Sequence, residues 1–254
     1  MPGVTFQQEG KVGIIEIDLP STLNSLCREL HAGLDEKLSE AAKSDVRAVI
    51  LKGNQRSFST GGNLSELGEL SNPIEGKEYV EEVHKLIRRI YNLPRVTIAL
   101  VEGYALGAGL SIALACDLIY AGENAKFSIP FLNVGLVPDC GASLLLARLV
   151  GMQKAKELAF TGKMIDAAEA LNIGLVANVF PAAAALKETK ALADQIAQGP
   201  TKALAWAKTN FERAAQLGLE ATLTLEEYAQ GLCIFGEEHR EGREAFFAKR
   251  KPTF

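Results

Sequence analysis

The stretch Gly103-Tyr104-Ala105-Leu106-Gly107-Ala108-Gly109-Leu110-Ser111 follows the β-branched run 96–101 and leads into an apolar segment. This order predicts a strand, a tight glycine turn and the first turn of a buried helix. A second stretch, Ser57-Phe58-Ser59-Thr60-Gly61-Gly62-Asn63-Leu64, follows the apolar run 46–52 in the same way. Glycine allows a chain to turn sharply and to approach another backbone closely. The sequence therefore predicts two strand ends that each carry a glycine loop.

Strand and helix patterns alternate around these loops through the first 180 residues. The strand signals are β-branched and end at turn residues, whereas the segments between them have helical periodicity. This alternation predicts an α/β core with mostly parallel strand pairing. Because the order is not a regular strand–helix–strand repeat, a bent sheet and a split sheet are both compatible with it. The predicted strands are 12–17, 46–52, 96–101, 117–121 and 125–129, and the predicted helices are 25–44, 76–93 and 141–161.

The sequence changes character after Phe180. Four amphipathic helical segments follow, with glycine or proline at the breaks between them. We therefore divide the chain into a core at 1–195 and a helical C-terminal region at 196–254. The apolar faces of these helices need a covering surface, which is either the chain's own core or a neighbouring subunit. The four helices are predicted at 182–197, 201–216, 219–235 and 238–249.

Composition and charge limit the class of protein. The chain has 254 residues, of which 48% are hydrophobic and 23% are charged, and its formal net charge is −4. This balance gives no electrostatic support for nucleic-acid binding. The first residues lack the pattern of a signal peptide, and the longest apolar stretch, 104–115, is too short to cross a bilayer. The four cysteines form no CxxC motif, which predicts free thiols, no metal site and a cytoplasmic protein.

The two glycine loops suit the binding of an oxygen atom that gains negative charge. A helix N-terminus presents unpaired N–H groups and partial positive charge. One backbone N–H from each loop could therefore complete an oxyanion hole. Neither loop matches a Walker A or a GxGxxG motif, so a nucleotide-phosphate or dinucleotide site has little support. Taken singly, each loop is better explained as an ordinary tight turn.

Several short motifs together resemble the crotonase (enoyl-CoA hydratase/isomerase) superfamily. The segment 58–64 is similar to the pattern F-(S/C)-A-G-x-D-(L/I), and 103–109 is similar to G-x-A-x-G-(G/A)-G. Cys116-Asp117-Leu118 matches the C-D-(I/L) motif after the apolar helix, and further similarities lie at 23–26, 135–138 and 245–252. The motifs occur in order along nearly the whole chain, and their combination is much more specific than any one of them.

The resemblance implies a crotonase fold, in which a ββα spiral core is followed by a helical region that builds homotrimers or hexamers. It also implies an acyl-CoA thioester as ligand, with coenzyme A as part of the substrate and no separate cofactor. By motif position, the oxyanion donors are the N–H groups of Gly62 and Ala108. The substrate-binding residues carried over in the same way are Leu23, Asn24, Thr60, Gly61, Asn63, Leu64, Phe131, Phe246 and Lys249. The segment 67–82 is expected to border the acyl pocket.

The chain departs from the family's hydratases at two positions. Those enzymes carry one glutamate two residues after the last glycine of the second loop and another after the following strand and proline. This chain has Ser111 and Phe131 there. Hydration needs a carboxylate to activate water and an acid to protonate the α-carbon, and neither side chain can do this. We therefore expect an enzyme that is not a hydratase.

Asp139 is the carboxylate that remains well placed. The string Pro138-Asp139-Cys140-Gly141 resembles the loop of epoxyphenylacetyl-CoA isomerases of phenylacetate degradation, and related Δ3,Δ2-enoyl-CoA isomerases place a single acid in this loop. An aspartate in an apolar acyl pocket suits a proton shuttle, because desolvation disfavours its charged form. The alternative is that Asp139 only caps the helix predicted to start at Gly141. The resemblance favours the catalytic role and an isomerase that shifts a double bond, or rearranges a ring, in an acyl-CoA.

Two other functions stay open. The position of His84 resembles that of the histidine base of 4-chlorobenzoyl-CoA dehalogenases, which use an aspartate nucleophile at the position of Asp139. Dehalogenation or thioester hydrolysis is therefore the alternative chemistry, although a lone helical histidine is usually structural. A non-catalytic acyl-CoA-binding protein is the third alternative, because Asn63 stands where the motif has aspartate and changes that loop's hydrogen bonds. His31 and His239 are expected at the surface.

Overall fold

The computed structural model describes residues 3–254. Its larger sheet has six strands in the order β1-β2-β3-β5-β7-β10. β1 and β2 form an antiparallel hairpin, and every other neighbouring pair in this sheet is parallel. The strands are β1 (Val4–Glu9), β2 (Val12–Ile17), β3 (Ala48–Lys52), β5 (Val96–Val101), β7 (Leu118–Gly122) and β10 (Asn178–Phe180).

A second, four-stranded sheet continues from three strands of the first. Shortly after β3, β5 and β7 end, the chain enters β4 (Ser57–Ser59), β6 (Tyr104–Leu106) and β8 (Lys126–Ser128), which pair in parallel. β9 (Ile165–Asp166) joins β8 in the antiparallel direction. Helical segments follow each of these strand pairs, which gives a repeated ββα unit. The expected α/β core is confirmed, and of the two sheet arrangements left open, the split sheet is the one observed.

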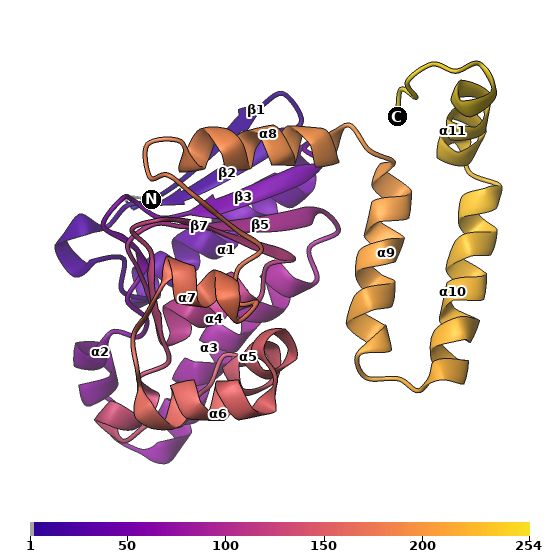
Figure 1. Cartoon of the computed structure of the whole chain (residues 1–254). Helices are drawn as coiled ribbons and strands as arrows, with labels where there is room; N and C mark the ends of the chain where they lie inside the picture. Colours follow the sequence, from indigo (N-terminus) through magenta and orange to yellow (C-terminus); the bar gives the residue numbers. More distant parts are fainter. Residues whose placement is uncertain (1–2) are drawn as a thin grey trace.

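Helices cover both faces of the larger sheet (Figure 1). On one side, α1 (Arg28–Lys43), α3 (Pro73–Tyr91) and α4 (Ala108–Leu114) share a hydrophobic core with the second sheet. On the other side, α8 (Ala185–Ala197) buries three of its alanines, Ala185, Ala193 and Ala197, against β2, β3, β5 and β7. The two glycine loops run from β4 and β6 toward the helices of the first side, so both lie where the second sheet meets these helices.

One predicted helix proves to be two. The segment predicted as a helix at 141–161 consists of α5 (Ala142–Val150) and α6 (Met152–Thr161). Gly151 separates them with a positive φ of 78°, which ends the first helix. The remaining short elements are η1 (Pro20–Thr22), α2 (Leu64–Gly68), η2 (Phe131–Val134) and α7 (Ala167–Asn172). Within residues 3–254, no helix is both long enough and apolar enough to span a bilayer.

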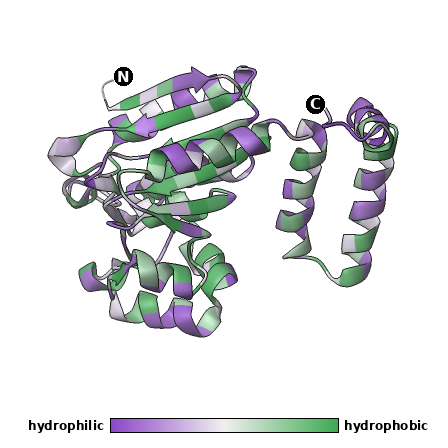
Figure 2. Cartoon of the chain, turned by 45° about the horizontal axis from the view of Figure 1, so that its top comes forward, coloured by the Kyte–Doolittle hydropathy of each residue, from purple (hydrophilic) through white to green (hydrophobic). Residues whose placement is uncertain are grey.

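We call α9 (Thr201–Ala214), α10 (Leu219–Ile234) and α11 (Glu237–Phe247) the C-terminal arm. The arm projects from the rest of the molecule (Figure 1) and contacts it through α9, where Lys208 Nζ pairs with Asp117 Oδ2 at 2.9 Å. Figure 2 shows many hydrophobic residues along the arm in green. Of its apolar side chains, all of which lie in the described range, Ala229 and Ala245 alone are buried. By contrast, Phe211 is 82% exposed and Phe235 is 94% exposed. The predicted division between residues 195 and 196 falls in the last turn of α8, just before the arm.

Candidate active site

A cavity of about 390 Å³ lies between the two glycine loops, α3 and the segment 130–140. Its wall is mainly aliphatic and aromatic, with a few polar groups, as is usual for small-molecule sites. The segment 67–82 borders the cavity, as expected, through Leu67, Tyr79 and Val80. Of the residues assigned to the site from the sequence, the structure brings together Thr60, Gly62, Leu64, Ala108, Phe131 and Asp139 in the wall.

The two glycine loops touch each other at two points that have no room for a side chain. A Cβ on Gly61 would lie 2.7 Å from the carbonyl oxygen of Leu106 and 3.1 Å from the nitrogen of Ala108. A Cβ on Gly109 would lie 2.3 Å from the carbonyl oxygen of Ser59. Since real Cβ atoms do not approach this closely, glycine at 61 and 109 is what allows the two loops to meet.

The N–H groups of Gly62 and Ala108 have no acceptor among the described residues. Leu26 pairs with Gly62 in a parallel bridge, bonding to Gly61 O at 2.7 Å and to Asn63 N at 3.4 Å. The Gly62 N–H therefore points away from Leu26. Ala108 is the first residue of α4, so its N–H is one of the unpaired donors of that helix. Both residues line the cavity, and each can offer it a backbone donor.

Asp139 lines the same cavity, and its Oδ1 is buried without a hydrogen-bond partner among the described residues. The helix after it, α5, has Gly141 as its N-cap, and no side chain caps that helix. The capping alternative for Asp139 is therefore wrong. Buried polar atoms are nearly always hydrogen-bonded, so this oxygen calls for an explanation such as a bound ligand.

The two positions that hold glutamates in hydratases offer no carboxylate. Ser111 is fully buried, and its Oγ lies 3.2 Å from Gly107 O and 3.4 Å from Asp139 O. Phe131 lines the cavity, and its ring lies beside Gly107, where a Cβ would be 3.7 Å from it. A hydroxyl bonded to backbone and an apolar ring therefore occupy these two places.

His84 of α3 lies next to the Asp139 loop without lining the cavity. Its Nε2 accepts a hydrogen bond from the backbone N–H of Cys140 at 3.2 Å. One ligand-type atom from each of His84, Asp139 and Cys140 lies within 4.8 Å of the others. Burial, and then the Asp139 carboxylate, raise the pKa of the Cys140 thiol, so the thiol stays protonated. The Nε2 lone pair of His84 is thus engaged by the backbone of the loop that carries Asp139.

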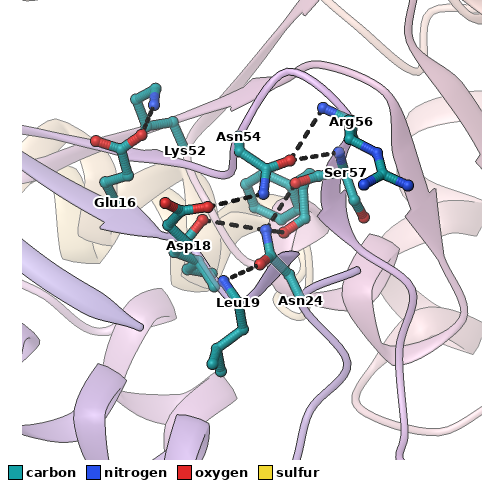
Figure 3. Close-up of polar contacts among 10 residues, drawn as sticks. Glu16, Asp18, Leu19, Asn24, Lys52, Asn54, Arg56 and Ser57 are labelled. Atoms are coloured by element: carbon teal, nitrogen blue, oxygen red, sulfur yellow. Dashed lines mark hydrogen bonds and ion pairs between the residues drawn. The ribbon is translucent and has the colours of Figure 1, made fainter. Parts of the chain in front are cut away.

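Asn24 lies beneath the first glycine loop with no exposed surface. Its Nδ2 donates to Ile17 O at 3.0 Å and to Ser57 O at 2.7 Å, and its Oδ1 accepts from Leu19 N at 2.6 Å (Figure 3). Its φ is 58°, a left-handed value that asparagine tolerates better than most residues. The side chain of Asn24 therefore supports the first glycine loop, and its predicted place along the substrate path stays a prediction.

Three more of the predicted substrate-binding residues lie beside the cavity and not in its wall. The carbonyl oxygen of Leu23 accepts from Thr60 N at 3.2 Å, and Gly61 is buried where the loops meet. Asn63 is the N-cap of α2, and its Oδ1 accepts from Ser65 N at 3.1 Å. Because an aspartate makes the same capping bond, the asparagine at 63 leaves the support of the loop intact.

The C-terminal candidates lie far along the chain from this site. Phe246 is 77% exposed at the end of α11, and Lys249 is exposed just beyond it. Neither residue lines the cavity. Within one copy of the chain, the structure therefore does not bring Phe246 and Lys249 to Asp139.

Two polar residues of the cavity wall were not named as site residues from the sequence. His31 was expected at the surface, but it lines the cavity from α1, and burial lowers the pKa of its imidazole. Tyr79 of α3 bonds through its hydroxyl to Glu66 Oε2 at 3.2 Å, and burial raises the pKa of that hydroxyl. For His31 the only sequence signal is a place on an amphipathic helix, which usually marks core positions, whereas Tyr79 falls within the segment 67–82 that was expected to border the pocket.

Comparison with known proteins gives one family. The sequence profile described as enoyl-CoA hydratase/isomerase matches residues 7–254. The chain is 37% identical to the short-chain-enoyl-CoA hydratase of Clostridium acetobutylicum, over 98% of this chain and 95% of that protein. It is 32% identical to the 2,3-dehydroadipyl-CoA hydratase of Escherichia coli, over 100% of this chain and 99% of that protein.

The fold agrees with this assignment. The crystal structure of an enoyl-CoA hydratase from Bacillus anthracis has a TM-score of 0.95 to this structure at 29% sequence identity. The match covers 99% of this chain and 98% of that one. With the split sheet, the two touching glycine loops and the helical arm all in place, the chain belongs to the enoyl-CoA hydratase/isomerase (crotonase) family of acyl-CoA enzymes.

Proposed function

We propose that this protein is an acyl-CoA isomerase that shifts a double bond, or rearranges a ring, in a CoA thioester, with Asp139 as its single proton carrier. The observation that carries the proposal is that Asp139 shares one apolar cavity with the two unpaired N–H groups of Gly62 and Ala108. One carboxyl group is what a proton shuttle needs, and two backbone donors are what a developing enolate oxygen needs.

The two backbone donors act on the thioester carbonyl. Hydrogen bonds from Gly62 N–H and Ala108 N–H to the thioester oxygen become stronger as negative charge builds on it. The α4 N-terminus, which begins at Ala108, adds partial positive charge at the same place. This stabilisation makes the carbons next to the carbonyl more acidic.

Asp139 moves the proton. From a 3-enoyl thioester, its carboxylate takes the proton at C2, and the electrons of that C–H bond enter a dienolate held by the two N–H groups. The same carboxyl then returns the proton to C4, which leaves the double bond between C2 and C3, in conjugation with the carbonyl. In the reverse direction, the proton leaves C4 and arrives at C2. The oxidation level of the acyl group does not change.

The relatives compared above are named hydratases, and the proposed activity differs from theirs for a residue-level reason. Neither Ser111, whose hydroxyl bonds to backbone oxygens, nor Phe131, which has no polar side-chain atom, can activate water. We therefore propose that 2-enoyl thioesters are conjugation products for this enzyme and not substrates for hydration.

The test is a panel of 3-enoyl- and 2-enoyl-CoA thioesters of several chain lengths, with conjugation and hydration followed separately. Asp139→Asn should lower the isomerisation rate by about 10²- to 10⁴-fold, the usual range for a lost acid–base group, and leave acyl-CoA affinity within a few-fold. Asp194→Asn, at an exposed position of α8, is the matched control and should leave the rate unchanged. Full activity of Asp139→Asn, or efficient hydration by the unmodified protein, would refute the proposal.

A second chemistry, dehalogenation or thioester hydrolysis, is favoured by the proximity of His84 to Asp139. In that mechanism Asp139 would attack carbon and expel halide or the coenzyme A thiolate, and water would then hydrolyse the bond between Asp139 and the product and restore the carboxylate. Reaction in ¹⁸O-labelled water separates the two proposals, because only the hydrolytic reaction carries label into a released product. Tight binding of acyl-CoA without turnover of any kind would point to a binding protein instead.

We also propose that the C-terminal arm assembles the chain into a homotrimer or hexamer. The exposed aromatic side chains of the arm, among them Phe211, Tyr228 and Phe235, give it an apolar surface that its own core does not cover. In such an assembly Phe246 and Lys249 would contact the coenzyme A part of a substrate bound to a neighbouring copy.

A further inference from the structure

The peptide unit between Asp139 and Cys140 is held from both of its edges. Its carbonyl oxygen, that of Asp139, accepts from Ala142 N at 2.9 Å and lies 3.4 Å from Ser111 Oγ. Its N–H, that of Cys140, donates to His84 Nε2 at 3.2 Å. Because a peptide unit is planar and includes the Cα atoms on both sides of it, fixing both edges fixes the plane and with it the position of the Asp139 Cα, from which the side chain projects.

This part of the loop would not keep its shape unaided. Cys140 has a φ of 53° and Gly141 a φ of 80°, so two consecutive residues adopt the left-handed conformation. A non-glycine residue in that region costs about 1–3 kcal/mol and persists only where its surroundings hold it. The bond from His84 is the contact through which α3 supplies such support.

α3 is a suitable anchor for that bond. It is a 19-residue helix, and Val83 and Leu86, on either side of His84 in the sequence, are both buried in the main hydrophobic core. The imidazole therefore projects from an element with little freedom to move. To accept the Cys140 N–H, Nε2 must be unprotonated, so the ring proton of neutral His84 sits on Nδ1.

We infer that His84 is a positioning residue for Asp139: it fixes the Asp139–Cys140 peptide plane by accepting the Cys140 N–H and takes no part in proton transfer itself. The inference rests on the proposed function of Asp139, and it assigns His84 a role different from that of a base or nucleophile activator. This role requires a hydrogen-bond acceptor for the Cys140 N–H, and that acceptor does not have to be an imidazole.

Two substitutions of nearly equal size separate these roles. In His84→Gln, the side-chain carbonyl can accept the Cys140 N–H, whereas His84→Met offers no acceptor of comparable strength. For isomerisation, His84→Met should lower kcat by about 10- to 100-fold, the range seen when a supporting hydrogen bond to a reactive group is lost, with KM changed less than about threefold. His84→Gln should stay within a few-fold of the unmodified enzyme in both parameters.

Amide exchange gives a readout that does not depend on turnover. The Cys140 N–H, followed by NMR, should exchange slowly in the unmodified protein and in His84→Gln, and much faster in His84→Met. Equal loss of kcat in the two variants would show that the imidazole itself transfers a proton, and unchanged kcat in His84→Met would show that no positioning is needed. Either result overturns the inference.

The experimental results would differ from these if the proposed isomerase function itself were wrong. In that case the unmodified protein would not isomerise any thioester of the panel, and the exchange rates alone would decide on His84. Protection of Cys140 that is the same in all three proteins would then reject the bond as a support for the loop.

Discussion

Gly109 lies where the second glycine loop contacts the first, and its substitution measures how much that contact contributes to stability. A Cβ there would lie 2.3 Å from Ser59 O and 2.7 Å from Ser59 Cβ, so Gly109→Ala must push the two loops apart. We expect a loss of about 1–3 kcal/mol in the free energy of unfolding, as for other overpacked sites, measured by urea denaturation. The rate of the proposed isomerisation should fall as well, because the loops that carry the Gly62 and Ala108 donors are pushed apart.

Gly76 provides the matched control for that substitution. It lies in α3, its φ is not positive, and a Cβ there would meet nothing within 4 Å. Gly76→Ala should therefore stabilise the protein by about 0.5–1 kcal/mol through helix propensity and leave activity unchanged. A Gly109→Ala variant that behaved like Gly76→Ala would contradict the described contact between the loops.

Asn24 supports the first loop from below. Replacing it with alanine would leave the Leu19 N–H without the acceptor Oδ1 and remove a donor from Ile17 O and from Ser57 O, of which Ser57 O still accepts from Asn54 N at 3.2 Å. Since a buried unsatisfied polar group costs about 1–3 kcal/mol, Asn24→Ala should lower the free energy of unfolding by at least about 2 kcal/mol. Thermal and urea unfolding check this value, and a loss below about 0.5 kcal/mol would contradict the supporting role.

Among single residues, those that lie in short recognisable motifs could be predicted from the sequence, whereas those whose role depends on tertiary packing could not. Gly62, Ala108 and Asp139 could be placed in one site because each lies in a short segment whose pattern is recognisable. The bond between His84 and Cys140 could not be predicted, because it depends on how α3 packs against a loop more than fifty residues away. The buried hydrogen bonds of Asn24 could not be predicted for the same reason, since its partners lie on separate segments.

Glu102 marks the place where β5 turns toward the second sheet, and it should make the stability of this junction depend on pH. It is 6% exposed, and burial raises the pKa of its carboxyl above the ordinary value of 4.5, with Lys52 opposing the shift. The folded state therefore binds this proton more tightly than the unfolded state. Its favourable contribution is present below about pH 4.5 and is lost as the pH rises through the raised value.

Glu102→Gln removes this titration. We expect the variant to melt at a higher temperature than the unmodified protein at about pH 8, where the buried charge destabilises the folded state, and at a similar temperature at about pH 4. Differential scanning calorimetry at the two pH values measures the change. A variant that melts lower at the higher pH would mean that the attraction to Lys52 outweighs the desolvation of the carboxylate.

The elements divide in the same way into those that the sequence predicts and those that it does not. Strands β2, β3, β5 and β7 are apolar runs that end at turn residues, so their pattern is visible. β4, β6 and β9 have two or three residues each, too few for a period-2 alternation to appear. The break at Gly151 was missed because apolar periodicity continues on both sides of it.

For the whole molecule, the exposed arm predicts self-association. Phe235 is 94% exposed, and Phe235→Glu should shift the chain toward monomer in analytical ultracentrifugation or light scattering. Met152→Glu, at a 57% exposed position of α6, is the control for adding a charge to an apolar surface residue. Assembly that survives Phe235→Glu unchanged would place the interface elsewhere. The sequence alone leaves this open, since an amphipathic helix does not tell which surface covers its apolar face.

The two buried clusters of the molecule also contain no residue beyond Ala197, so the three helices of the arm contribute nothing to either of them. Lowering the protein concentration should therefore reduce the thermal stability of the arm and leave that of the sheets unchanged. By mass action, lowering the protein concentration should move an early melting step, that of the arm, to lower temperature, while a later step, that of the sheets, stays where it is.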